Sequence, residues 1–208
     1  MCKIDVYLVR KGNAFVENVI SPKPLILDRT LSNHQGSDLI EAIIISLICL
    51  KRVDQAEKIL NENLQIVSFQ DDSLWLISNL FFKEDKFKTS IKLLEVITAE
   101  SHTHEYYALK AKCYINLRIL LQGNPGSQNC HLYLEKAIYA AENALNIDNK
   151  QSNVHLLLSN LYYDNLQYDK AISLCKTGLE LQESFDLRKL LIIIYLSQEN
   201  FLEVSIPA

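Results

Sequence analysis

The sequence predicts an all-α fold, a superhelical solenoid built from stacked α-α helical hairpins. Apolar residues recur at the three- and four-residue spacing of helices through most of the chain. The pattern of a two-helix unit then returns at intervals of about 34 residues, the length of a known helical repeat. Composition agrees, because the 208 residues are 49% hydrophobic and include only five glycines and four prolines, too few for a loop-rich β protein.

The clearest unit is the segment from Ser152 to Glu183, which reads as two antiparallel helices around a polar turn at 164–167. Small residues lie where the two helices must touch: Ser159 in the first, Ala171 and Gly178 in the second. A single helical hairpin leaves an apolar face uncovered, so it must stack on further copies of itself.

Further units follow the same pattern along the chain. A first repeat covers 37–70, a second starts at Asp71, and a third starts near Glu105. The third is interrupted by an insertion near 118–130, of which 118–121 extends the first helix and 122–129 forms an exposed loop. A fifth unit starts near Asp186 and holds little more than one helix, followed at best by a short second one.

Residues 1–36 do not fit the repeat. The apolar stretches 4–9 and 14–20 flank Lys11-Gly12-Asn13, which suits either a small β-hairpin or a degenerate first helix pair. Pro22 and Pro24 then break any helix, and 25–36 reads as an irregular connector. The chain is thus expected to comprise an N-terminal segment, 1–36, and a solenoid, 37–208.

Several repeats share a small residue three positions before an aromatic in the first helix, and a small residue early in the second. The first pattern occurs at Ser78/Phe81, Ala111/Tyr114 and Ser159/Tyr162, and the second at Ala56, Ala137 and Ala171. In these features the chain resembles the tetratricopeptide repeat (TPR) superfamily, over about four and a half repeats from Ser37 onward. His155 and Glu183 depart from the pattern, where a tryptophan and a proline are usual. The alternative, an unrelated helical bundle, would not need a period near 34.

The sequence offers no support for catalysis, a cofactor or a metal. It contains no glycine-rich phosphate loop and no nucleophile elbow. His102, His104, Cys130 and His131 are the only closely spaced potential ligands, and a zinc site would require all four to converge. Cys2 has no companion cysteine nearby. We therefore expect a protein that is not an enzyme.

Charge and hydropathy restrict the partners and the compartment. A net charge of −4 gives no basic field for nucleic acid. The apolar runs at 42–50 and 190–196 are too short to cross a membrane, and Asp5, Arg10 and Lys11 interrupt any secretory signal. Five dispersed cysteines favour a reducing compartment. We expect an intracellular, cytoplasmic protein, with nuclear or cytoskeleton-associated placement also compatible.

The resemblance implies a concave groove, lined by the first helices of the repeats, that receives a peptide or partner helix. The groove residues expected here are Trp75, Asn79, Phe82, Lys112, Ile115, Leu156, Asn160 and Tyr163. This implies a non-catalytic scaffold or adaptor, a subunit of a larger assembly, that binds an apolar or amphipathic segment. The alternative is a chaperone that shields an apolar client segment.

Related repeat domains that bind acidic C-terminal peptides of large cytosolic chaperones use a clamp of lysine, arginine and asparagine. Four of the corresponding places here hold Glu41, Trp75, Ala108 and Leu156. Only Asn79, Lys112 and Asn160 match, so no useful affinity for such peptides is expected.

The last helix is apolar on almost all sides, and its residues Leu190, Ile193 and Ile194 are expected to form a C-terminal interface. Three explanations stay open: a partner completes the repeat, the chain pairs end to end with itself as an oligomer, or a longer solenoid continues beyond it. A continuation or a partner is favoured over self-pairing, since nothing specifically encodes a symmetric contact.

Overall fold

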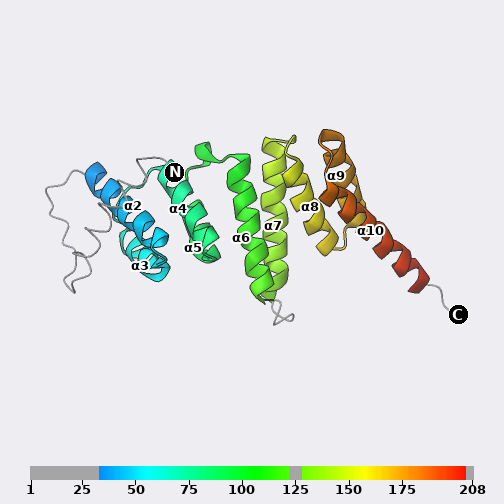
Figure 1. Cartoon of the computed structure of the whole chain (residues 1–208), viewed down its shortest axis with the longest axis horizontal. Helices are drawn as coiled ribbons and strands as arrows, with labels where there is room; N and C mark the ends of the chain where they lie inside the picture. Colours follow the sequence, from blue (N-terminus) through cyan, green and yellow to red (C-terminus); the bar gives the residue numbers. More distant parts are fainter. Residues whose placement is uncertain (1–32, 122–127, 205–208) are drawn as a thin grey trace. The chain divides into compact units, whose positions relative to one another are not determined.

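The computed structural model describes residues 33–121 and 128–204, and these residues are predominantly helical (Figure 1). In chain order the elements are α2 (Asn33–Cys49), α3 (Val53–Asn63), α4 (Asp71–Lys83), α5 (Phe87–Leu94), the short 3-10 helix η1 (Ala99–Ser101), α6 (His104–Leu121), α7 (Gln128–Ile147), α8 (Ser152–Asp164), α9 (Tyr168–Leu181) and α10 (Phe185–Val204). The predicted all-α class is confirmed. No helix within the described ranges is long and apolar enough to span a bilayer.

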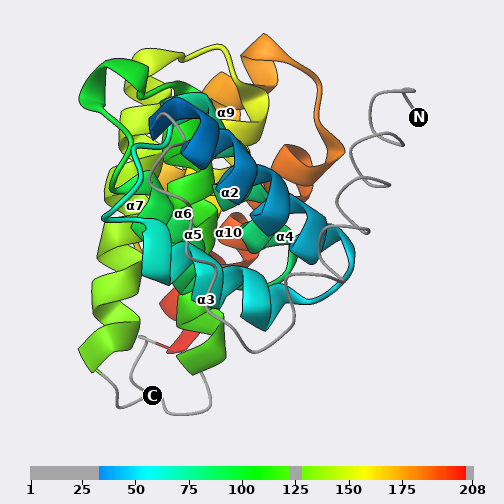
Figure 2. The same cartoon turned by 90° about the vertical axis from the view of Figure 1, so that its left-hand side faces the viewer.

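The helices pair as the repeats predict. First helices α2, α4, α6 and α8 pack on second helices α3, α5, α7 and α9, and α10 packs on both α9 and α8. Figure 2 shows α2 and α3 lying side by side. The chain divides into two compact units, of which unit 1 ends at Ser101 and holds α2–α5 and unit 2 starts at His102 and holds α6–α10.

Three of the hairpin turns share one backbone geometry. Lys51, Asp85 and Leu166 have φ values of 61°, 59° and 58°, in the left-handed region that closes a helix. The residue after each of them donates its N–H to a carbonyl five residues back, on Leu47, Phe81 and Tyr162, in each case at 2.9 Å. This bond satisfies a carbonyl that the helix end would otherwise leave without a partner. It also helps the chain to reverse its direction within a few residues.

Each first helix carries a row of three positions spaced i, i+4 and i+7, here named the paired face. In α6 and α8 this row contacts the second helix, where Lys136 lies over the Tyr114 ring and Lys170 over the Tyr162 ring. The three positions are Ile40, Ile44 and Leu47 in α2; Leu74, Ser78 and Phe81 in α4; Tyr107, Ala111 and Tyr114 in α6; and His155, Ser159 and Tyr162 in α8. All but the partly exposed Tyr107 are buried. The small residues predicted early in the second helices, Ala56, Ala137 and Ala171, are fully buried as well, and so is Ser90 at the same place in α5. A small residue opposite a large one lets the two helices approach closely.

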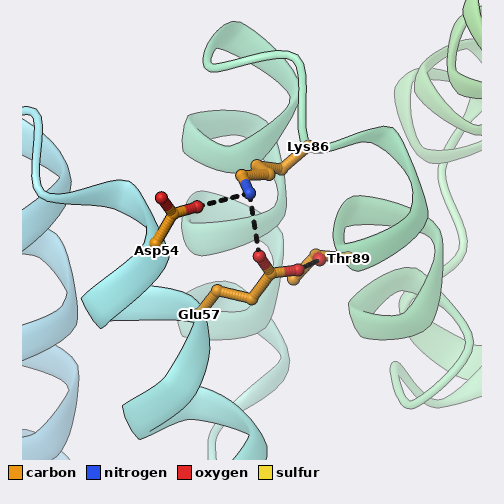
Figure 3. A network of polar contacts seen from close by, with 4 residues as sticks. All are labelled: Asp54, Glu57, Lys86 and Thr89. Atoms are coloured by element: carbon orange, nitrogen blue, oxygen red, sulfur yellow. Dashed lines mark hydrogen bonds and ion pairs between the residues drawn. The ribbon is translucent and has the colours of Figure 1, made fainter.

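In unit 1, polar side chains join the first hairpin to the second. Lys86 Nζ lies 2.6 Å from Asp54 Oδ1 and 3.1 Å from Glu57 Oε2, and Thr89 also donates to Glu57 (Figure 3). Further along, Lys51 bonds Glu84, Ser73 bonds Glu41, and Lys92 bonds Asn61, each pair 31–33 residues apart. Burial disfavours the charged form of Glu57, but the bonds from Thr89 and Lys86 outweigh it and hold the carboxyl pKa below its ordinary value.

In unit 2, α9 packs closely on α8 and α10, and polar contacts join α8 to α7 and to α6. A Cβ added to Gly178 of α9 would lie 2.8 Å from Leu187 Cδ1 and 2.9 Å from His155 Cβ, so α9 touches α8 and α10 at this glycine. Tyr162 donates its hydroxyl to Glu142, and its burial followed by this bond raises its pKa. Arg118 of α6 pairs with Asp164 of α8 at 2.6 Å.

Some boundaries differ from prediction. Helix α2 starts at Asn33, inside the expected connector, and α7 starts at Gln128, inside the expected loop. Helix α5 ends at Leu94, and beyond it Thr98 and Ser101 bond the Asp71 carboxylate and fold the chain back onto α4, with Ile97 buried. After α10 starts at Phe185, it continues unbroken to Val204, where a turn into a short second helix was expected. The predicted structures at 1–32 and the loop at 122–127 lie outside the described residues.

Candidate functional site

Unit 1 presents an aromatic surface on α4. Trp75, Asn79 and Phe82 recur at the i, i+4, i+7 spacing, and all three are partly exposed. The Asn79 amide donates to the Trp75 carbonyl at 2.9 Å, and the Phe82 ring meets the edge of Phe87 at a centroid distance of 5.6 Å. The i, i+4, i+7 spacing places the three side chains along one side of α4. The predicted residues of unit 1 therefore share one helix face.

Unit 2 presents a hollow of about 250 Å³ between α6 and α8. Its lining consists of Ala108, Lys112, Asn153, Val154, Leu156, Leu157 and Asn160. Three of the predicted groove residues, Lys112, Leu156 and Asn160, meet here. They reach one place because α6 and α8 are the first helices of successive repeats and present equivalent positions side by side.

The hollow combines an apolar lining with polar side chains. Val154 is buried beneath it, and Leu156 and Leu157 are partly exposed. Lys112 and Asn160 are exposed, and among the described residues Lys112 has no ion-pair partner. The Asn160 amide donates one bond to the Leu156 carbonyl at 2.8 Å, which leaves its side-chain oxygen as an acceptor. Such a surface can take an apolar side chain and hold a nearby carbonyl or carboxylate.

The other two predicted residues of unit 2 lie along the same helices but outside the hollow. Ile115 is partly exposed on α6, about one turn beyond Lys112. Tyr163 on α8 is linked to α10, because its hydroxyl lies 3.1 Å from Ser197 Oγ and its ring lies 5.8 Å from that of Tyr168. Tyr163 therefore already has intramolecular contacts on the side facing α10.

The sequence prediction missed Asn153, Val154 and Leu157 as lining residues. It followed a single row of positions along each first helix, whereas a hollow between two helices also uses the row that faces the neighbouring helix. The available signal was the spacing of Asn153, Leu157 and Asn160, which again places i, i+4 and i+7 on one side of a helix.

The predicted C-terminal interface residues separate in the structure. Leu190 and Ile194 are buried within unit 2, where α10 packs on α8 and α9. Ile193 is 37% exposed. Of the three, only Ile193 therefore belongs to the exposed surface, and its apolar neighbours there are Ile192, Tyr195 and Leu196.

The histidines considered as metal ligands have other local contacts. His102 stacks on Tyr106 with a centroid distance of 4.0 Å, and its Nδ1 lies 3.2 Å from the Tyr107 hydroxyl. His131 lies 3.4 Å from Glu135 on the exposed side of α7. Within 33–121 and 128–204, no three His, Cys, Asp or Glu side chains come together as a metal site would require.

No family model and no curated protein matches this chain. Solved structures do resemble it. YrrB, described as a TPR protein with an unusual peptide-binding site, aligns with 91% of this chain and 86% of its own at 10% identity and a TM-score of 0.59. TTC0263, a thermophilic TPR protein of Thermus thermophilus, aligns over 80% and 83% at 19% identity and 0.52. The Sgt2 TPR domain from Aspergillus fumigatus aligns over 66% and 85% at 20% identity and 0.52.

Proposed function

Because this chain has the tetratricopeptide-repeat fold, we propose that it is a non-catalytic interaction scaffold or adaptor, an intracellular subunit of a larger assembly. It holds an apolar or amphipathic segment of a partner protein against the exposed sides of its first helices. The observation that carries this proposal is the hollow between α6 and α8, where partly exposed leucines stand beside an exposed lysine and asparagine. The peptide-binding site named for YrrB, a protein of the same fold, supports this assignment.

The chemistry of the hollow defines the ligand class. An apolar side chain packs against Leu156 and Leu157, and burial of such a group is worth about 1.5–3 kcal/mol when complete. Lys112 provides a single positive charge at the same place, which favours a carbonyl or an isolated carboxylate nearby. On α4, Trp75 and Phe82 provide a second apolar contact surface, since aromatic residues often dominate the energetics of interfaces.

The charges near both predicted contact surfaces disfavour a strongly acidic ligand. Glu41 accepts a bond from Ser73 at 2.6 Å and adds negative charge to unit 1. In unit 2, the hollow has Lys112 as its only cation among the described residues. We therefore expect no useful affinity for the acidic C-terminal peptides that related domains clamp. Tight binding of such a peptide that weakens with salt and is lost in Lys112→Ala would contradict this.

The test is selection of peptides from a random library displayed on phage, followed by fluorescence anisotropy with the full chain. We expect the selected peptides to carry spaced apolar residues. Leu156→Glu should weaken their binding at least tenfold, and Lys112→Ala by a smaller factor. The matched controls are Leu132→Glu and Lys176→Ala, which alter exposed residues of the second helices α7 and α9. Equal losses in the test and control variants would show that the hollow is not the binding site.

The rate at which the bound partner segment exchanges distinguishes a scaffold from a chaperone. A scaffold should form complexes of fixed stoichiometry with its native partner that survive gel filtration. A chaperone should release its client when unlabelled client is added in excess. Rapid exchange of the labelled segment, with no stable complex in mass photometry, would replace the scaffold assignment with the chaperone one.

A further inference from the structure

Helix α10 has the sequence register of a first helix. Its buried residues Leu187 and Ile194 stand 33 residues after Val154 and Leu161, which are buried in α8. The same offset assigns Arg188, Ile192 and Tyr195 to the three positions of the paired face. These correspond to His155, Ser159 and Tyr162 of α8, whose contacts with α9 are shown by Gly178 beside His155 and by Lys170 over the Tyr162 ring.

The paired face of α10 is exposed. Ile192 is 60% exposed, Tyr195 is 41% exposed, and the Arg188 side chain is 58% exposed. One turn earlier, Phe185 continues the same row and is 80% exposed. In the other first helices these positions are buried, except for Tyr107, and each of those helices packs on a second helix. Between Phe185 and Val204 the structure describes one continuous helix, so within the described residues no second helix follows to cover this face.

The other hairpins show what covers such a face. In α3, α5 and α9 the fourth residue of the helix is small, and Ala56, Ser90 and Ala171 are all fully buried. Four residues later come Leu60, Leu94 and Cys175, all buried too. The covering helix is therefore amphipathic. In the α8–α9 hairpin, Gly178 lies against His155 and Lys170 lies over the Tyr162 ring, so the antiparallel register brings the small residue Ala171 next to Tyr162, at the last position of the paired face.

We propose that the paired face of α10 is a docking site for one amphipathic helix of a partner protein. The helix lies antiparallel to α10 in the place that α9 takes beside α8. Its small residue packs on Tyr195 and its next apolar residue on Ile192. Arg188 and Lys189 lie at the other end of the face, and both are exposed, so acidic residues in the C-terminal part of the incoming helix complement it. The Arg188–Glu183 pair does not prevent this, because both side chains are largely exposed and such pairs are weak.

A second copy of the chain fits this face less well. In antiparallel self-pairing of α10, large residues would meet where each of the four hairpins that the structure describes places a small one. Ile192 of one copy would face Ile192 of the other, and Tyr195 of each copy would face the segment of the other copy near Arg188. The axes of the two α10 helices would then have to separate. They could not approach each other as closely as α9 approaches α8 at Gly178. This docking surface is separate from the hollow between α6 and α8, and its test does not depend on that site.

The probe is a fluorescein-labelled synthetic peptide with the sequence of α9, residues 167–182, in which Cys175 is replaced by alanine. A second peptide adds two glutamates, Lys176→Glu and Thr177→Glu, near the end expected to meet Arg188. We expect the full chain to bind the first peptide, and to bind the second several-fold more tightly at low salt. A third peptide, with Ala171→Phe at the small position, should bind at least tenfold more weakly than the first.

Variants of the full chain identify the surface. Ile192→Glu and Tyr195→Glu should each weaken peptide binding at least tenfold, while Ile66→Glu, an equally apolar and 80% exposed site in unit 1, should not change it. Leu156→Glu should also leave it unchanged, which separates this site from the hollow. Circular dichroism of each variant checks that the fold is retained, as expected for exposed positions. Displacement of the resident α9, rather than docking on α10, would give binding that Ile192→Glu does not affect and would overturn the proposal.

Sedimentation velocity decides between the partner helix and a second copy. We expect a single species across the concentration range in the absence of peptide. A dimer that Ile192→Glu dissociates would show that a second copy covers this face and would overturn the proposal. Absence of peptide binding at concentrations up to a millimolar would overturn it as well.

Discussion

In unit 1 the two hairpins meet along a row of hydrogen bonds and ion pairs, whereas in unit 2 helices α8, α9 and α10 meet around a glycine with no space for a methyl group. The Lys86, Asp54 and Glu57 contacts of unit 1 depend on the charge of their members (Figure 3). The contact around Gly178 depends on shape alone. Both contacts join repeats of the same kind. The repeat therefore determines which positions of neighbouring helices touch, but not whether the contact between them is polar or apolar.

The largest effect should come from the core of unit 1. Phe81 is fully buried on the paired face of α4, so Phe81→Ala should lower the free energy of unfolding by about 3–5 kcal/mol. Urea denaturation measures the loss, and hydrogen exchange should place its onset in α4 and α5. The control Phe185→Ala, at a position 80% exposed, should change stability by less than about 0.5 kcal/mol. Similar losses in both variants would contradict the assigned core.

A steric change should affect unit 2. Gly178→Ala places a methyl within 3 Å of both His155 and Leu187, and such overpacking costs about 1–3 kcal/mol. The better helix propensity of alanine returns up to about 1 kcal/mol, so we expect a net loss near 1–2 kcal/mol. Thermal unfolding measures it. Ser173→Ala, on the exposed side of the same helix, should be neutral or stabilising; a stabilised Gly178→Ala variant would show that α8 and α10 separate readily.

The turns provide a smaller contrast between the units. Leu166 has a φ of 58° and is 67% exposed, so it bears the strain of the left-handed region without contributing much packing. Leu166→Gly should raise the free energy of unfolding by about 0.5–1 kcal/mol. Lys51→Gly in unit 1 should raise it less, because it also removes the contact of Lys51 with Glu84. Chemical denaturation of both variants tests whether Leu166→Gly stabilises more than Lys51→Gly. A destabilised Leu166→Gly variant would contradict the backbone strain assigned to Leu166.

The smallest effect should be the dependence of unit 1 on pH. The folded-state pKa of Glu57 is held below its ordinary value of 4.5, so its contribution to stability is present above that value and is lost as the pH falls through the lowered pKa. Glu57→Gln should flatten the acid limb of the stability curve by about 0.2–1 kcal/mol, the range for ion pairs near the surface. The control Glu62→Gln alters an exposed carboxyl on the same helix. Acid limbs of equal slope in wild type and Glu57→Gln would exclude the Glu57 contacts as the cause.

Hydrophobic spacing predicted the repeats well because each helix buries one continuous side. The small residues Ala56, Ala137 and Ala171 were predicted at helix contacts and are all fully buried. The end of α5 was not predictable from its own residues, because it depends on Asp71 binding Thr98 and Ser101 from another part of the chain. For the hollow, Lys112, Leu156 and Asn160 followed from register. Asn153 and Leu157 share a side of α8 with Asn160 in the sequence, but only the position of α6 beside α8 assigns that side to the lining.

The polar contacts between the two hairpins of unit 1 also affect how such a protein can lengthen by duplication of its repeats. Most of its contacts run in one direction, with acceptors Glu41, Asp54, Glu57 and Asn61 on the first hairpin and donors Ser73, Lys86, Thr89 and Lys92 on the second. At the four acceptor positions, 34 residues on, the second hairpin carries Trp75, Lys88, Ile91 and Glu95 instead. A tandem copy of the second hairpin would thus meet Trp75, Lys88 and Ile91 where its donors need acceptors, so the order of these two hairpins is encoded in their side chains.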